Sequence, residues 1–363
     1  MTHHFDRPPL SVCLLRLSAI GDTCHALAAL RMLQAAWPQA RFTWIIGKPE
    51  ARLMIALLPE IEFITFDKSA LTAGLLSVRR SLAGRRFDLL LHMQLSIRAS
   101  LVSTLISAPV RLGFDRRRAR ELQWLFTNER IAPGGREHVL DTLLGFVRAC
   151  GIEPGPPRWS PTLPAAVLRY ADGLVSAGRP TMVISPCSSH ELRNWPADRY
   201  AAVAAHAQRA HGMHVVLAGG PSASERRMGE AIMRAAPAGI VNQIGKDTLP
   251  ELLGLLARST VLLSPDSGPV HMATMVGLPV IGLYAATRTA RAGPYLSREW
   301  CVDEYDRAAR DFLGKPADQV PWTAKIERPG VMQLIGVGAV TAKLDALMAM
   351  RRAGGPKFAK IRA

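Results

Sequence analysis

The chain has 363 residues, of which 48% are hydrophobic and 20% are charged, so we expect a globular protein with a sizeable core and two domains. Its five cysteines are scattered, odd in number and never spaced as CxxC, which argues against a disulfide framework or a zinc site and for a reducing compartment. No long apolar run precedes Arg16, so no signal peptide is expected and the protein is predicted to be cytoplasmic.

The net charge of +16 comes from 45 lysines and arginines against 29 aspartates and glutamates. Such an excess predicts an anionic partner: a nucleic acid, an acidic membrane surface or a phosphorylated substrate. Aromatic residues make up only 6% of the chain and no RNA-binding signature is present, so nucleic acid is not expected. An arginine-rich proteome is the alternative explanation for the basic composition.

The first half of the chain alternates short apolar runs with helical segments. Residues 11–15 form the first predicted strand, and RLSAIGDT (16–23) leads from it into a helix that ends near residue 36. Further strands are predicted at 41–46, 62–66, 87–92 and 109–112, and further helices at 49–57, 71–82, 97–106 and 137–149. This alternation predicts an open parallel α/β domain.

Two charged features of this half are candidates for function. Asp22 lies at or near the cap of the first helix, where it is either a plain N-cap or a general base at the carboxyl end of a strand. A basic loop after a later strand is either a solvated face or a contact for an anionic acceptor; it contains Arg116, Arg117, Arg118 and Arg120.

Residues 151–164 contain five prolines and two glycines, which is typical of a linker, and we place the domain boundary there. After this segment, predicted strands and helices alternate again. Strands are predicted at 181–185, 213–218, 240–241, 261–263 and 279–283. Residues 285–330 have an irregular pattern, and 331–350 predict one long C-terminal helix despite two glycines.

Two loops of the second half offer groups that bind phosphate. Residues 186–196 follow a strand and include Ser188, Ser189 and Arg193. Residues 264–269 (SPDSGP) lead into a helix that Asp266 or Ser267 can cap, with Gly268 allowing close approach to the backbone and His271 one turn on. The alternative is a well-capped helix with a buried histidine. Residues 267–287 lack charged side chains, but their prolines and glycines predict short elements and not a membrane span.

Three segments together resemble glycosyltransferase family 9, whose best-known members are the ADP-heptose:lipopolysaccharide heptosyltransferases. They are RLSAIGDTCHALAAL (16–30), SPCSSHELRNWPADRY (185–200) and SPDSGPVHMATMVGLPVIGLY (264–284). The resemblance covers nearly the whole chain. It implies a GT-B fold, in which two Rossmann-like domains with parallel sheets face each other across a cleft. Residues 1–164 would then bind the acceptor and 165–363 the nucleotide-sugar, with helix 331–350 crossing back to the first domain.

The resemblance also implies an inverting, metal-independent transferase. It would move a heptose from ADP-L-glycero-D-manno-heptose to the inner core of lipopolysaccharide, built on a lipid A precursor. No cofactor or metal is expected, and no DxD pair is placed to hold a metal against a diphosphate. Besides donor and acceptor, the expected partner is the anionic inner-membrane surface, where charge would hold a cytoplasmic enzyme peripherally.

Carried over residue by residue, the resemblance assigns roles to the candidate side chains. Asp22 matches the proposed catalytic base. The other matches concern the donor. Ser188, Ser189 and Arg193 correspond to the diphosphate loop, and Asp266, Ser267, Gly268 and His271 to the signature near diphosphate and sugar.

Four further positions concern the donor: Asp266, Ser222, Thr287 and Arg288. Because a carboxylate repels a diphosphate, Asp266 is assigned to helix capping or to a sugar hydroxyl. Ser222 stands where some heptosyltransferases carry an acidic residue, so its contact with the ribose is expected to differ. Thr287 and Arg288, after the third segment, are further candidates to face the donor.

Alternatives remain open at this point. A family-9-like transferase can use another nucleotide-sugar, and a nucleotide-sugar epimerase of the same fold would need no lipid acceptor. A non-catalytic nucleotide-binding module would be indifferent to Asp22→Asn. A dinucleotide oxidoreductase is rejected because the loop after the first strand is SAIGDT and not GxGxxG.

Overall fold

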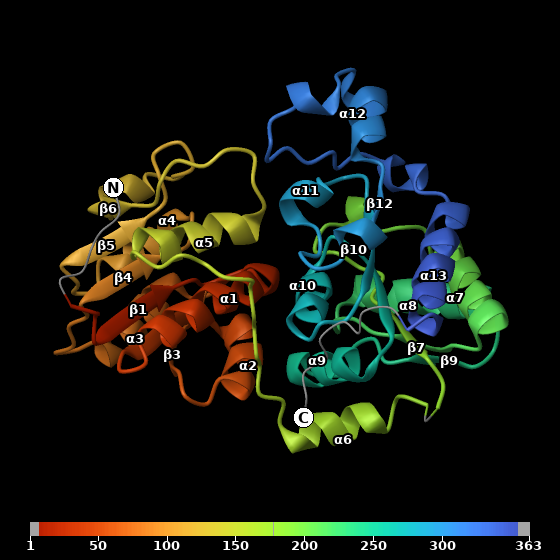
Figure 1. Cartoon of the computed structure of the whole chain (residues 1–363), viewed down its shortest axis with the longest axis horizontal. Coiled ribbons are helices and arrows are strands. Elements are labelled where there is room, and N and C mark those ends of the chain that lie inside the picture. Colours follow the sequence, from red (N-terminus) through yellow and green to blue (C-terminus); the bar gives the residue numbers. More distant parts are fainter. Residues whose placement is uncertain (1–6, 177, 355–363) are drawn as a thin grey trace. The chain divides into compact units, whose positions relative to one another are not determined.

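The computed structural model describes residues 7–176 and 178–354 (Figure 1). The chain divides into two compact units, Met1–Thr162 and Leu163–Ala363. The boundary therefore lies two residues before the one placed from the sequence, at the end of the proline-rich segment. Each unit is a parallel sheet flanked by helices.

The first unit contains a six-stranded sheet in the order β3-β2-β1-β4-β5-β6. Its strands are β1 Ser11–Leu15, β2 Arg41–Gly47, β3 Glu62–Phe66, β4 Leu89–His92, β5 Val110–Gly113 and β6 Glu129–Arg130. Its helices are α1 Ile20–Ala36, α2 Lys48–Leu57, α3 Leu71–Ser81, α4 Ile97–Ser103 and α5 Val139–Ala149. All five strand pairings are parallel.

The second unit repeats this arrangement with the order β12-β11-β10-β7-β8-β9, again all parallel. Its strands are β7 Thr181–Ile184, β8 His214–Leu217, β9 Ile240–Asn242, β10 Val261–Pro265, β11 Val280–Tyr284 and β12 Val302–Asp303. Its helices are α6 Ala165–Asp172, α7 Ala197–His211, α8 Ala223–Ala235, α9 Leu249–Arg258, α10 Gly268–Met275, α11 Thr289–Ala292, α12 Tyr305–Leu313 and α13 Val337–Arg352.

The strands read as continuous apolar runs because the central ones are buried on both faces. In the first unit, Cys13 and Leu15 of β1 lie in the same core cluster as Val78 of α3 and Val102 of α4. In the second unit, Ile184 of β7 shares a core with residues of α7 and α13, including Val203, Ala207, Leu344 and Leu347. The prediction of two Rossmann-like α/β domains is confirmed.

Both sheets reverse their strand order beside the first strand, between β1 and β4 and between β7 and β10. In open parallel sheets, ligands bind outside the carboxyl ends of the strands at such a switch point. The fold therefore predicts that ligands bind at the segments that follow β1, β4, β7 and β10.

Some predicted elements differ from the structure. The single helix predicted over 331–350 is wrong: a short 3-10 turn (Val331–Leu334) precedes α13, and Gly336 is the N-cap with extended φ and ψ of −81° and 147°. Residues 285–330 are more ordered than expected, since they contain β12, α11 and α12. The sequence also missed α6 and the two-residue strand β6.

The C-terminal helix α13 packs on α7 of its own unit. Its predicted crossing to the first domain stays a prediction. Within the described residues, no helix is long and apolar enough to cross a membrane.

Candidate functional site

Asp22 lies in the segment after β1, at the switch point of the first sheet. Because α1 begins at Ile20 with Ala19 as its N-cap, Asp22 is the third residue of the helix and not its cap. Its Oδ2 accepts a hydrogen bond from the backbone N–H of Ala19 at 3.2 Å and pairs with Arg16 Nη2 at 2.5 Å. The side chain is 34% exposed, so the carboxylate is held in place and still reachable by a substrate.

Arg16 connects the two strands that flank this switch point. It is only 8% exposed, and its Nη1 donates to the carbonyl of Met93, which follows β4. The next residue, Gln94, accepts through Oε1 from the backbone N–H groups of Leu17 and Ser18, at 3.1 and 3.2 Å. The segment between β1 and α1, which leads to Asp22, is therefore fixed by the loop after β4.

His92, the last residue of β4, is a neutral group at this edge. Burial, followed by the charge of Arg111, lowers the pKa of His92 to about 3. Its Nδ1 lies 3.1 Å from Gln123 Nε2, which also donates to the His92 carbonyl at 2.8 Å. Of His92 and Asp22, only Asp22 is therefore an exposed acid–base group.

The four arginines of the basic loop after β5 differ in their surroundings. Arg118 is 19% exposed and pairs with the carboxylates of both Asp115 and Glu137, which gives it a structural role. Arg116 is exposed and stacks over the ring of Trp124, 5.2 Å from its centroid. Arg117 and Arg120 are exposed as well. Three of the four predicted acceptor arginines thus face solvent.

In the second unit, the segment after β7 places hydroxyl groups at the second switch point. The backbone N–H of Ser188 donates to Asn194 Oδ1 at 2.7 Å, which folds the loop back on itself. Ser188 Oγ is buried and has no hydrogen-bond partner among the described residues, so it is available to a ligand. Ser189 next to it is exposed.

Arg193 is the centre of a charged cluster that spans three loops. Its Nε and Nη2 donate to Glu327 Oε1 at 2.7 and 2.5 Å, and its Nη1 lies 3.4 Å from Asp266 Oδ2. The Arg193 side chain is 11% exposed and that of Asp266 14%. The structure therefore brings together two predicted donor residues, Arg193 and Asp266, and adds Glu327.

Lys325 belongs to the same electrostatic environment. Burial, together with the nearby charge of Arg193, lowers the pKa of Lys325. For Glu327, burial acts to raise the pKa, but the hydrogen bonds and charge of Arg193 outweigh it and the pKa is lowered. Two cations and two carboxylates thus lie at the carboxyl ends of β7 and β10, where a diphosphate can exchange with a carboxylate as the partner of Arg193.

Helix α10 begins at Gly268, directly after β10 and its loop. Ser267 is the N-cap, but its Oγ lies 2.8 Å from Ser264 Oγ, and no side chain of the described residues caps the helix. The assignment of Asp266 to helix capping is therefore wrong. The first N–H groups of a helix have no partner within it, so those of α10 remain for an anion. His271, in the first turn, is 8% exposed.

The loop after β8 carries Ser222, which caps α8 by accepting from the Glu225 N–H at 3.2 Å. Glu225 folds back over the glycine turn, where its carboxylate accepts from the Gly220 N–H. A Cβ at Gly219 or Gly220 would lie 2.9 or 2.7 Å from that carboxylate. An acidic group therefore does occupy this turn, supplied three residues after Ser222.

A groove of about 500 Å³ lies in the second unit, between the loop after β7, α8 and the turn before α13. None of the predicted donor residues lines it. We place the candidate site at the switch points, because the predicted polar and charged side chains converge there and none of them lines the groove.

A family model for glycosyltransferase family 9 (heptosyltransferase) matches residues 75–320. The chain is also 38% identical over 343 residues to "Lipopolysaccharide core heptosyltransferase OpsX" of Haemophilus influenzae, covering 94% of this chain and 98% of that protein. This chain belongs to glycosyltransferase family 9. It is 24% identical to "Lipopolysaccharide heptosyltransferase 3" of E. coli K12, covering 74% of this chain and 80% of that one.

Solved structures confirm the fold class of this family 9 enzyme. A family 9 glycosyltransferase from Veillonella parvula superposes with a TM-score of 0.77 at 20% identity, covering 93% of this chain and 97% of that one. The E. coli heptosyltransferase WaaC, solved with ADP, superposes with a TM-score of 0.73 at 18% identity, covering 93% and 99%. The predicted GT-B fold class and the predicted glycosyltransferase activity are confirmed.

One suggested donor residue of this family 9 chain is buried among contacts within its own unit. Arg288 is 8% exposed, donates to the carbonyls of Ala317 and Val320, and lies 4.3 Å from the ring centroid of Tyr305. It fixes the loop before Trp322, and its suggested role toward the donor stays a prediction. Thr287 is buried beside it, 5% exposed.

Sequence reasoning missed four side chains that the structure adds to the two switch points: Arg16, Gln94, Lys325 and Glu327. Arg16 stands at the head of the first quoted segment, so its place in the pattern RLSAIGD was a usable signal. Glu327 is 134 residues from Arg193 and lies in a stretch without periodicity, so nothing local identified it.

Proposed function

We propose that this enzyme moves a heptose from ADP-L-glycero-D-manno-heptose to the inner core of lipopolysaccharide, with inversion and without a metal. The observation that carries the proposal is Asp22, held by Arg16 at the carboxyl end of β1 in a chain 38% identical to a lipopolysaccharide core heptosyltransferase. Known structures of the family include WaaC with ADP, which supports an ADP-linked donor.

In the proposed reaction, Asp22 takes the proton of the acceptor hydroxyl as that oxygen bonds to the anomeric carbon. The bond from the anomeric carbon to the phosphate oxygen breaks, and ADP leaves with that electron pair. An aspartate is a weak base, with a reference pKa of about 4, so proton transfer accompanies the attack and does not precede it. Stabilising the leaving diphosphate must then supply much of the acceleration.

The second unit provides the groups for that stabilisation. Arg193, the unpartnered Ser188 hydroxyl and the N–H groups at the start of α10 all follow β7 or β10. We assign Ser189, Ser267, Gly268 and His271 to the same donor, and Asp266 to a sugar hydroxyl. Ser222 and Glu225 lie at the turn after β8, where a ribose would be the partner of Glu225.

The acceptor side of the proposal rests on charge. Arg116, Arg117 and Arg120 are exposed in the first unit, and phosphates or acidic sugars of the inner core would pair with them. The lipid part of the acceptor would lie in the inner membrane, so we place the enzyme at its cytoplasmic face, bound peripherally.

Two substitutions test base and donor site separately. Asp22→Asn should lower transfer to a heptose-deficient lipopolysaccharide by about 10²–10⁴-fold, because it removes the general base, and leave ADP binding within about two-fold. Arg193→Gln should weaken ADP binding by about ten-fold or more, as expected for a lost charged hydrogen bond. Arg234→Gln, an exposed arginine at the end of α8, is the matched control.

Thermal-shift measurements with ADP, UDP, GDP and NAD at equal concentration identify the nucleotide, since a ligand at a hundred times its Kd stabilises by about 2.7 kcal/mol. Selective stabilisation by UDP or GDP would overturn the heptose donor and leave the transferase class. Full turnover of Asp22→Asn, measured by mass spectrometry of the product, would overturn the base.

A further inference from the structure

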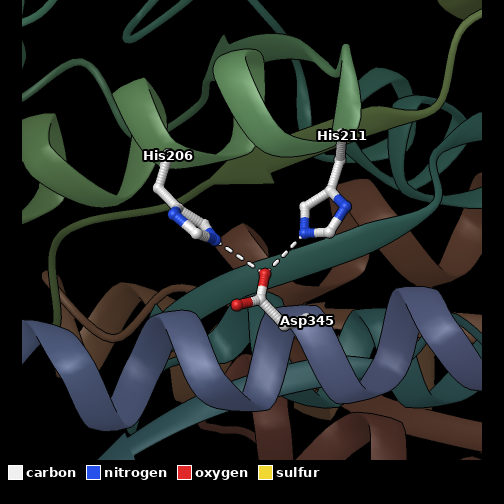
Figure 2. A group of neighbouring side chains, drawn as sticks. All are labelled: His206, His211 and Asp345. Atoms are coloured by element: carbon white, nitrogen blue, oxygen red, sulfur yellow. Dashed lines mark hydrogen bonds and ion pairs between the residues drawn. The ribbon is translucent and has the colours of Figure 1, made fainter.

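A cluster of three metal-type ligands lies on the second unit, away from the transferase site. Figure 2 shows His206 and His211 of α7 converging on Asp345 of α13. Each histidine Nε2 lies 2.6 Å from Asp345 Oδ1, and the three ligand atoms lie within 4.8 Å of one another. We propose that His206, His211 and Asp345 bind a divalent transition metal of the Zn²⁺ class, which fastens α13 to α7.

The chemistry of the ligand set supports this assignment. Two imidazole nitrogens and one carboxylate oxygen suit Zn²⁺ and its first-row neighbours, whereas Mg²⁺ and Ca²⁺ prefer oxygen ligands only. With tetrahedral metal–ligand bonds of about 2.0–2.2 Å, the ligand atoms would lie about 3.3–3.6 Å apart. The present hydrogen bonds therefore need to open by about 1 Å or less, which side-chain rotation provides.

The two helices hold the ligands in place. Ala204 and Ala207 of α7 and Leu344 and Leu347 of α13 are fully buried in one core. The ligands project from these packed helices, and sites on rigid elements keep their geometry better than sites on loops. His211 is 5% exposed, His206 28% and Asp345 48%, so an ion can enter from solvent and water can complete its coordination.

The neighbouring Arg352 disfavours metal binding at His211, which gives the proposal a further test. Its Nη1 lies 3.5 Å from Nδ1 of His211. A donor at Nδ1 favours the tautomer with hydrogen on Nε2, whereas a metal ligand needs a lone pair on Nε2 and an acceptor for the Nδ1 hydrogen. The positive charge of Arg352 also repels a dication. Removing Arg352 should therefore tighten metal binding.

The metal would not take part in sugar transfer. Helix α7 starts just after the loop of Arg193 and runs for 15 residues, about 22 Å, to His211. His211 then precedes β8 directly, at the edge of the sheet that holds the amino ends of the strands. The site needs no cysteine, which is why the cysteine pattern of the sequence gave no indication of it.

Metal binding is measured by titrating the full-length metal-free protein with ZnCl₂ and CoCl₂ in calorimetry and visible absorption. All proteins carry His3→Ala and His4→Ala, because the N-terminal His-His pair can bind metal independently. We expect one Zn²⁺ per chain with micromolar affinity, a Co²⁺ spectrum without a thiolate charge-transfer band, and no binding of Mg²⁺ or Ca²⁺. Zinc should also raise the Tm.

The variants decide the assignment. His206→Ala, His211→Ala and Asp345→Asn should each weaken Zn²⁺ binding at least ten-fold and abolish the zinc-dependent rise in Tm, whereas His214→Gln, a histidine just beyond the site, should change neither. Arg352→Ala, which removes no ligand, should tighten binding about three-fold or more. Absence of zinc binding, or zinc binding that these ligand variants leave intact, would overturn the proposal. So would weaker binding by Arg352→Ala.

Discussion

Asp247, in the loop between β9 and α9, is a carboxyl group with an unusual environment. Its Oδ2 is buried and has no hydrogen-bond partner among the described residues. Burial raises the pKa of Asp247 to about 7; a backbone hydrogen bond opposes this shift, and the charges of Glu251 and Glu225 add to it. The folded protein therefore keeps a proton on Asp247 at pH values where an unfolded aspartate, with a pKa of 3.8, has lost it.

This difference predicts the sign of a pH effect. Between about pH 4 and pH 7 the folded state binds more protons than the unfolded state, so the contribution of Asp247 to stability falls as pH rises through that window. Asp247→Asn removes the ionisation, so it should stabilise the protein at pH 8 by about 1–2 kcal/mol, after discounting for partial exposure. At pH 4.5 the two proteins should be nearly equal.

Urea unfolding at the two pH values measures this difference. Asp311→Asn is the control, because Asp311 is 47% exposed and its ion pair with Arg307 lies on the surface. A stabilisation by Asp247→Asn that is the same at pH 4.5 and pH 8 would contradict the role given to burial.

The sequence identified candidate residues at the switch points more readily than the partners that hold them. Asp22, Ser188 and Arg193 each stand within eight residues after the end of a predicted strand, so local pattern and topology made them candidates. Their interaction partners come from distant parts of the chain and were not predicted. Glu327 is brought to Arg193 by folding across 134 residues, and Asp345 is brought to His206 across 139. Such pairings depend on tertiary packing, which one sequence does not encode in any local period.

At the scale of elements, α13 is anchored to the start and the body of α7. Trp195 Nε1 donates to the Ile335 carbonyl at 3.0 Å, and Arg199 Nη1 donates to the Gln333 carbonyl at 2.8 Å, which fixes the turn before α13. Leu344 of α13 is fully buried in the core that includes Val203 of α7. The C-terminal helix is therefore part of the core of the second unit.

Leu344→Ala should destabilise the protein by about 2–5 kcal/mol, the cost of a cavity in a packed core. Lys343→Ala on the same helix should cost about 0.5 kcal/mol or less, because the Lys343 side chain donates to the Glu299 carbonyl at the surface. Denaturant unfolding of the two variants compares them directly. Equal, small effects would mean that α13 detaches without opening the core.

The same segment explains where element prediction failed. Residues 331–350 are rich enough in helix-forming and apolar residues to be read as one helix, but Gly336 adopts an extended conformation and caps α13. Helix α6 was missed because it follows the proline-rich stretch immediately, with Pro164 as its N-cap. Central strands were predicted well, because burial on both faces leaves a continuous apolar run.

At the scale of the molecule, the charge of +16 has a local counterpart on the first unit. Leu122 and Leu125 are 54% and 58% exposed beside the exposed arginines of the loop after β5. Glu121 Oε2 accepts from the backbone N–H of Ile97 at 2.6 Å, which joins this loop to the start of α4, where Ile97 is 45% exposed. Exposed apolar residues among basic ones suit the interface of an anionic membrane.

This surface predicts binding to vesicles that contain anionic lipid. Affinity should fall steeply between 0.05 and 0.5 M salt, because screening shortens the reach of the charges, and neutral phosphatidylcholine vesicles should bind weakly. A triple variant, Arg116→Gln, Arg117→Gln and Arg120→Gln, should weaken binding at least ten-fold in co-sedimentation. The matched triple of Arg79→Gln, Arg80→Gln and Arg86→Gln removes the same charge from other exposed positions and should weaken it about three-fold or less. Equal losses would assign binding to net charge alone, and no binding to anionic vesicles at low salt would contradict the peripheral location.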